Sequence, residues 1–253
     1  MKRLTVFAVT VLIATLGSGI ALAQSSGNFS YGNTGDTHCV VNSSTGAITG
    51  GASCAQSSVC TAAGCTIVPD PNAQDCAGSL AAGIKTNNGS GNVFVIQPSA
   101  VIGLLTDVTV QKNATINVGT SSAFAGVDFE VIATDPSGNP AKTIPSFPIT
   151  YAARFIQIST NLFDVLGTQC TGTNTIGGVT TAAVGCFITF NESTVSAHSF
   201  QWLVPELQTG NYAIAANWKA SLGNTGISRS LTCVGPVNLT VQQNKVFSFN
   251  SIN

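Results

Sequence analysis

The sequence predicts an all-β protein, built as an immunoglobulin-like or jelly-roll β-sandwich that carries a cysteine-rich, loop-rich N-terminal segment. Three observations lead to this prediction. Short apolar runs with period-two alternation recur at roughly ten-residue spacing after residue 92. Turns rich in Gly, Pro and Asn separate these runs. A helical pattern sustained over about ten residues is missing.

Residues 1–23 have the pattern of a cleavable secretion signal. Lys2 and Arg3 precede an almost wholly apolar run over residues 4–14, and Ala21-Leu22-Ala23 forms a small-x-small cleavage site. The apolar run is shorter than the roughly 20 residues that span a bilayer. We therefore expect cleavage after Ala23, no transmembrane segment in the mature chain, and a secreted, periplasmic or cell-surface location.

Residues 24–92 form the cysteine-rich segment, which holds five cysteines, many Gly, Ser, Thr and Asn residues, and few periodic apolar runs. Residues 28–35 and 42–51 are typical of loops or short hairpins, and residues 69–72 (PDPN) of a turn. Residues 74–84 (QDCAGSLAAGI) suggest a short helix. Because such a segment buries little apolar surface, we expect disulfides to hold it against the following domain.

Residues 93–253 form the predicted sandwich domain. A buried run at 93–96 is expected to stop at Pro98, and a second alternating stretch at 104–118 contains a turn at Lys112-Asn113. Residues 127–133 place alternate side chains on one face, and a Pro/Gly-rich turn follows at 135–140. The remaining predicted strands span 147–151, 154–158, 185–190, 198–204, 212–218, 228–234 and 237–241.

The segment from Leu207 to Tyr212 (LQTGNY) has the spacing LxxGxY. It resembles the tyrosine corner of Greek-key sandwiches, in which a tyrosine that opens a strand hydrogen-bonds back across the preceding turn. Ile214, Ala216 and Trp218 follow Tyr212 at period two, as such a strand requires. The resemblance covers about a dozen residues; it favours a sandwich and implies no activity.

The cysteines predict four disulfides, because eight of them follow the signal in an exported chain. The gaps in the first cluster do not match the short paired gaps of structural zinc sites. Five cysteines precede residue 93 and three follow it, so if all pair, at least one bridge joins the two regions, unless Cys76 belongs to the sandwich. We expect Cys170 to pair with Cys186 and Cys233 with an N-terminal cysteine. The eight are Cys39, Cys54, Cys60, Cys65, Cys76, Cys170, Cys186 and Cys233.

The charge pattern excludes some partners. Charged residues are 8% of the chain, against the usual quarter. Lys2 and Arg3 leave with the signal, so seven of the nine basic residues face ten acidic ones and the mature net charge is about −3. No basic cluster is present to neutralise phosphates, so we do not expect nucleic acid as a partner. A weakly charged surface instead favours self-association or contact with extracellular polysaccharide.

The ligand-face candidates are Asp128, Glu130 and Trp202. The two acids lie two apart on a predicted strand, so their carboxylates share a face. With a second carboxylate at about 5–10 Å they could run glycoside hydrolysis, and with an acid from elsewhere they could bind calcium; the alternative is a solvated strand face. Trp202 could stack on a sugar or pack in the core, whereas Trp218 is expected in the core.

The two histidines give no catalytic assignment. His198 has many serines around it, but no GxSxG motif occurs. His38 precedes Cys39, whose thiol we expect to be lost to a disulfide. We therefore assign no catalytic or cofactor-binding residue, and calcium is the one cofactor that the acids suggest.

Three hypotheses of function follow. The first is a non-catalytic secreted or cell-envelope protein that serves adhesion, a matrix or a surface assembly. It follows from the low charge, the expected disulfides and the absence of a recognisable pair of catalytic groups in the sequence. The alternative is a carbohydrate-binding, lectin-like module, and the second alternative is a secreted glycoside hydrolase.

Overall fold

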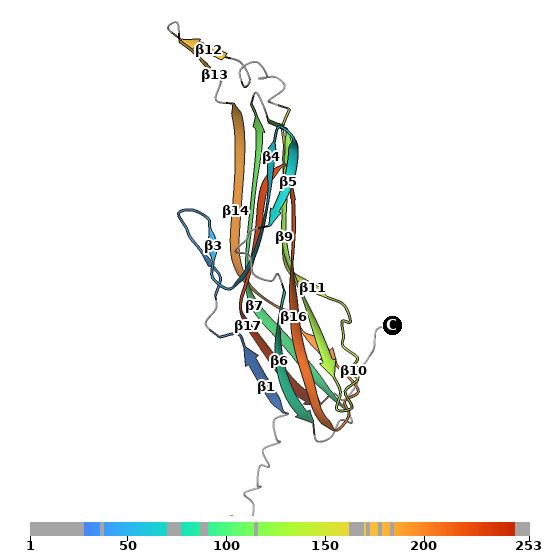
Figure 1. Cartoon of the computed structure of the whole chain (residues 1–253). Helices are drawn as coiled ribbons and strands as arrows, with labels where there is room; N and C mark the ends of the chain where they lie inside the picture. Colours follow the sequence, from blue (N-terminus) through green and yellow to red (C-terminus); the bar gives the residue numbers. More distant parts are fainter. Residues whose placement is uncertain are drawn as a thin grey trace, which may run out of the picture.

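The computed structural model describes residues 28–35, 38–69, 77–86, 91–113, 116–161, 170, 173–176, 179–182 and 185–245. The expected signal, residues 1–23, lies outside these ranges. The regular elements of the described residues are β-strands, which confirms the all-β class. No helix in them has the length and hydropathy needed to cross a membrane. Long strands run through most of an elongated molecule (Figure 1).

Eight strands make up the first sheet, and all their pairings are antiparallel. Its main path runs β14 (Cys186–Ser199), β7 (Asn92–Lys112), β17 (Ile227–Lys245), β4 (Ala52–Thr61) and β5 (Gly64–Pro69). Beside this path, β1 (Phe29–Asn33) pairs with β17, whereas β8 (Asn117–Val118) and β15 (Trp202–Val204) pair with β7.

Five strands make up the second sheet, again antiparallel. Its path runs β10 (Pro140–Ala141), β9 (Thr120–Thr134), β16 (Gly210–Thr225) and β6 (Ala77–Thr86), and β11 (Ile149–Ser159) also pairs with β9. Two small hairpins complete the fold: β2 (Val40–Val41) with β3 (Ile48–Thr49), and β12 (Thr173–Ile176) with β13 (Val179–Ala182).

The main core contains side chains from both large sheets. Phe94, Ile96 and Ile102 of β7 cluster with Phe129 of β9 and Ile214 of β16, and all five are fully buried. Period-two alternation explains this arrangement, because successive side chains of a strand point to opposite faces. The predicted alternation of Val127, Phe129 and Val131 is confirmed, since these three are buried while Asp128 and Glu130 between them are partly exposed.

Strands from both parts of the sequence share the two sheets. From the cysteine-rich segment, β1 and β4 pair with β17, and β6 pairs with β16. The predicted cross-link between the regions is confirmed as Cys39–Cys233, and Cys170–Cys186 is confirmed as well.

Two further cysteines close the β4–β5 hairpin as Cys60–Cys65. Cys54 is also disulfide-bonded. Cys76 lies outside the described residues.

Several predicted strand boundaries are wrong: the strand expected at 198–204 is divided between β14 and β15, whereas 228–234 and 237–241 belong to the single strand β17. The strands expected at 147–151 and 154–158 fall in β11, which begins at Ile149.

Two further local expectations are also wrong. The strand at 93–96 does not stop at Pro98, because β7 continues unbroken to Lys112. On one side of β7, pairing with β15 ends at Ile96 and pairing with β14 begins at Ser99, so Pro98 falls in the gap between them, where a missing N–H removes no ladder bond on that side. The expected helix at 74–84 is a strand from Ala77 onward.

The reason for the second error lies in the small residues of β6. Leu80, Ala82 and Ile84 point toward the core at period two. The Gly and Ala residues between them hide that alternation in the sequence, and the pairing with β16 decides the conformation.

The tyrosine corner is present. The backbone N–H of Gln208 donates a hydrogen bond of 2.7 Å to the Tyr212 hydroxyl, four residues on. Tyr212, Ile214, Ala216 and Trp218 are all buried, as the alternation requires. The turn at 135–140 is also confirmed: the Asp135 carboxylate accepts bonds from the backbone N–H groups of residues 137 and 139.

Candidate functional site

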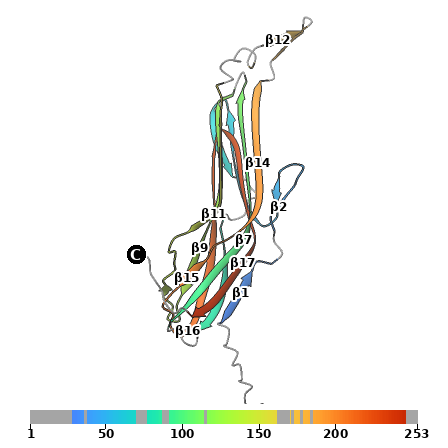
Figure 2. The same ribbon diagram turned by 180° about the vertical axis from the view of Figure 1, so that it is seen from behind.

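The free edge of β14 is one candidate site. The 14 residues of β14 pair one for one with β7, without a register shift, and no other described strand pairs with them. The strand contains no Lys, Arg or Pro, which are residues that proteins use to block edge pairing. In both views the upper part of β14 forms the lateral margin of the molecule, and the β2–β3 hairpin lies outside its lower part (Figures 1 and 2). Its outer edge therefore presents backbone donors and acceptors to a further strand.

Exposed apolar side chains lie on both faces of the first half of β14. Ile188 and Phe190 stand opposite Val110 and Val108 of β7 and so share the core-facing side, yet they are 39% and 50% exposed. Phe187 points to the other face and is 68% exposed. Such a cluster beside an open edge is typical of contact surfaces rather than of a solvated strand.

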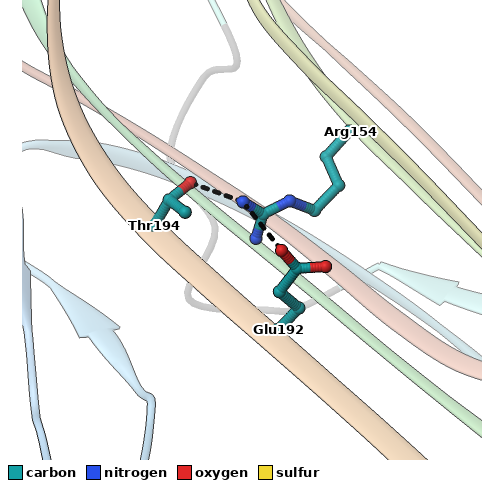
Figure 3. A network of polar contacts seen from close by, with 3 residues as sticks. All are labelled: Arg154, Glu192 and Thr194. Carbon is teal, nitrogen blue, oxygen red and sulfur yellow. Dashed lines mark hydrogen bonds and ion pairs between the residues drawn. The ribbon is translucent and has the colours of Figure 1, made fainter.

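A polar contact ties β14 to the second sheet (Figure 3). Arg154 of β11 donates from Nη2 to Thr194 Oγ1 at 2.8 Å, and the same nitrogen lies 3.4 Å from Glu192 Oε1. The Arg154 side chain is 14% exposed and that of Glu192 is 47% exposed. Because Glu192 is half exposed, the ion pair is worth at most about 1 kcal/mol, and its main effect is to fix where β14 lies against β11.

Asp107 of β7 lies beside this strand. It stands opposite Asn191 of β14 on one side and Arg229 of β17 on the other. Burial raises the pKa of the Asp107 carboxyl, while the hydrogen bond with the Asn191 side chain and the Arg229 charge lower it by less. The charged form is therefore disfavoured by the fold, since Asp107 Oδ1 is buried without a hydrogen-bond partner.

Replacing Asp107 with Asn should raise the melting temperature slightly at pH 7 and leave it unchanged well below pH 3.8. The native Asp107 pKa lies above its unfolded value, so the native state holds its proton longer and stability falls as pH rises through the interval between the two pKa values. Thermal unfolding of both proteins from pH 3 to 7 measures the difference. A variant that is less stable than wild type at pH 7 would contradict this account.

Ser196 and His198 are brought together farther along β14. Ser196 Oγ lies 2.6 Å from His198 Nε2. Among the described residues no carboxylate contacts the His198 ring, and the pair lies on an edge strand outside the hollow that contains Asp128. A nucleophile and a base without an orienting acid do not complete a hydrolytic triad. His38 precedes a disulfide-bonded Cys39, so it has no thiolate neighbour there.

The second candidate site is a hollow of about 540 Å³ that contains Asp128 and Glu130. The register places Asp128 opposite Lys219, and Glu130 opposite Asn217 of β16. These four side chains share the solvent face of the second sheet, because Phe129 and Trp218 between them belong to the core. Thr150 donates a 2.5 Å hydrogen bond to Asp128 Oδ1.

Among the described residues, no third acid joins this pair. Asp107 and Glu192 belong to the first sheet, and Asp164 lies outside the described residues. In the described ranges, no group of three or more His, Cys, Asp or Glu side chains could hold a metal ion. Within the described residues, the geometry therefore adds no further acid to Asp128 and Glu130 for calcium binding or glycoside hydrolysis.

Trp202 does not lie on a ligand-facing surface. It is fully buried opposite Ile96 of β7, and its ring packs 5.0 Å from Phe200 and 6.3 Å from Tyr151, between ring centroids. The physical reason is its place in β15, a strand that lies over the main core. The apolar neighbours Leu203 and Val204 were the sequence signal that could have indicated this.

Sequence reasoning missed the residues that depend on strand register. Asn217 and Lys219 reach Asp128 and Glu130 only through the pairing of β16 with β9. Arg154 reaches Glu192 only because two edge strands of different sheets meet. No local motif in the sequence marks either set.

Comparison with known proteins places the chain in no family. No protein-family model matches, and no curated protein matches. A chain in the crystal structure of the T13 IBDV viral particle shows 11% identity over 92% of this chain, with a TM-score of 0.12. The alignment spans 56% of the length of that viral chain. At this TM-score the likeness carries no argument about fold or function.

Proposed function

We propose that this chain is an exported, non-catalytic component of a surface assembly, and that it associates through the free edge of β14. The observation that carries the proposal is a 14-residue edge strand without Lys, Arg or Pro, whose one charged residue, Glu192, is paired with Arg154. The exposed side chains of Phe187, Ile188 and Phe190 lie on the same strand. Edges of this kind are templates for a further strand. If the protein assembles through this pairing, residues that prevent edge pairing would be disfavoured on β14.

The finer architecture and the location belong to the same proposal. Two antiparallel sheets that share one apolar core, together with a tyrosine corner, support an immunoglobulin-like or jelly-roll sandwich. The disulfides Cys39–Cys233, Cys60–Cys65 and Cys170–Cys186 favour an oxidising, extracellular environment. The secretion-signal pattern in residues 1–23 would direct the chain to that environment. Adhesion is one use of such an assembly.

The opposite edge of the same sheet offers a partner surface. β5 pairs only with β4 among the described strands, and every one of its residues is exposed, including Ile67 and Val68 at 55% and 44%. Pairing of β14 with β14 of a second copy gives a closed dimer, whereas pairing of β14 with β5 gives an open series of copies. Both use the β14 edge, and the size distribution separates them.

Lysine substitution on β14 tests this proposal. We expect the purified mature protein to show a concentration-dependent rise in mass by light scattering, and the double variant Phe187→Lys/Phe190→Lys to remain monomeric. Two lysines at a shared edge repel the lysines of a symmetry mate, and packing them against the uncharged β5 removes their charges from water at a cost. Both phenylalanines are at least half exposed, so the change leaves the core in place.

The matched control is Phe147→Lys, which changes a phenylalanine of similar exposure, 60%, outside any strand. It should assemble as wild type does. A wild-type protein that stays monomeric up to about 100 µM, or a double variant that assembles equally well, would rule the proposal out.

A further inference from the structure

The hollow on the second sheet has unpartnered polar groups of complementary kinds. Within the described part of the chain, the side chains of Glu130, Asn217 and Lys219 make no hydrogen bond or ion pair, and Asp128 is bonded only by Thr150. Glu130 is an acceptor, Lys219 is a donor, and Asn217 is both. These groups stand on neighbouring positions of β9 and β16, so they converge on one ligand-sized volume.

Small residues keep this volume open. Ala77, Gly78 and Ser79 of β6 line it, opposite Lys219, Trp218 and Asn217 of β16. Gly78 lies opposite Trp218 on the core-facing side of the sheet, where an added Cβ would lie 2.2 Å from Trp218 Cζ2, so this glycine allows the Trp218 ring to pack beneath the hollow. The surface of the lining is mostly apolar, and Pro148 also contributes to it. Its volume of about 540 Å³ falls in the range of small-molecule sites.

We propose that the hollow formed by Asp128, Glu130, Asn217 and Lys219 binds a neutral sugar unit of a polysaccharide. Sugar hydroxyls both donate and accept hydrogen bonds, so they suit a set in which carboxylates, an amide and an ammonium group alternate. The C–H faces of the sugar ring suit the apolar wall. Two carboxylates against one lysine disfavour an acidic sugar. No metal ion is needed, because the protein groups themselves supply donors and acceptors.

This site is independent of the β14 edge, since it lies on the second sheet and β14 belongs to the first. A protein that assembles without binding sugar, or binds sugar without assembling, separates the two proposals. The experiment below therefore uses the monomeric concentration range and reads out sugar binding alone.

The test is calorimetric titration of the mature protein with neutral tetrasaccharides of glucose, galactose, mannose and xylose, and with the tetrasaccharide of galacturonate, all in EDTA. We expect at least one neutral tetrasaccharide to bind and the galacturonate probe to bind at least tenfold more weakly. Ser79→Phe, which fills the hollow from an exposed position, should weaken binding at least tenfold. Glu130→Gln should weaken it about tenfold, because a hydrogen bond to a charged acceptor is lost.

The matched control is Ala81→Phe, two residues along β6 on the same exposed face and outside the lining of the hollow. It should bind within twofold of wild type. The proposal is overturned if none of the neutral probes binds, if galacturonate binds more tightly than all of them, or if both Ser79→Phe and Glu130→Gln bind as the control does.

Discussion

Replacing Cys39 and Cys233 together with alanine should lower the free energy of unfolding by about 2–5 kcal/mol. The bridge joins residues 194 apart in sequence, and in the chain-entropy model the stabilisation grows with the length of the closed loop. Both cysteines are buried, at 6% and 0% exposure, in a small cluster with Ile48, Leu105 and Leu231. Removing the sulfurs therefore also loosens the packing of the N-terminal segment against the first sheet.

Denaturant unfolding, followed by circular dichroism, measures this effect. The matched control is the double alanine variant at Cys60 and Cys65, whose bridge spans only five residues in the β4–β5 hairpin. The control should lose less, because the loop it closes is short. An equal or larger loss in the control would show that the Cys39–Cys233 bridge does not hold the N-terminal segment as described.

Trp202→Ala should be the most destabilising of the single core changes, at about 3–5 kcal/mol. Trp202 is the largest fully buried side chain, and its ring contacts both Phe200 and Tyr151. Truncation leaves a large cavity under β15 that the paired strands cannot collapse to fill. Chemical denaturation of the purified variant gives the loss directly.

Two companion variants sharpen this result. Trp202→Phe should cost much less than Trp202→Ala, because it keeps an aromatic ring and removes Nε1, a buried donor without a hydrogen-bond partner. Phe200→Ala, at a position that is 41% exposed, should also cost less. If Trp202→Ala unfolds at the same denaturant concentration as wild type, the residue is not in the core.

Much of the fold could be predicted from single-strand patterns. The alternation of Val127, Phe129 and Val131 identifies a face, and the LxxGxY spacing at Tyr212 identifies a corner, because both signals are local. Two odd cysteine counts predicted a bridge between the regions if all eight cysteines pair, and Cys39–Cys233 is such a bridge. The Cys170–Cys186 pair, expected across a Gly/Thr-rich loop, is also present.

The errors arise where pairing overrides local signals. Residues 77–84 look helical because Gly and Ala conceal the period-two pattern, but the β16 partner makes them a strand. Pro98 looks like a stop, yet it occupies a gap between two partner strands. Trp202 could not be assigned to a face until β15 was placed over the core. In each case the deciding neighbour is about 100 or more residues away in the sequence.

Strand pairing also decides which residues of the candidate sites the sequence could predict. Asp128 and Glu130 were found because two residues on one strand share a face, whereas Asn217 and Lys219 join them only through strand register. The β14 edge depends on the order of strands in a sheet, which no single segment of sequence specifies. The sequence therefore predicted the residues that β9 contributes to the hollow, but not those of β16 and not the free edge of β14.

Hydrogen–deuterium exchange of the mature protein at low and high concentration tests edge pairing most directly. Half of the β14 amides lack a partner in β7, because alternate groups of an edge strand point away from its neighbour. The account predicts that residues 186–199 become more protected as concentration rises, while β1 and β6 do not change. Unchanged protection of β14 at concentrations where the protein has assembled would contradict it.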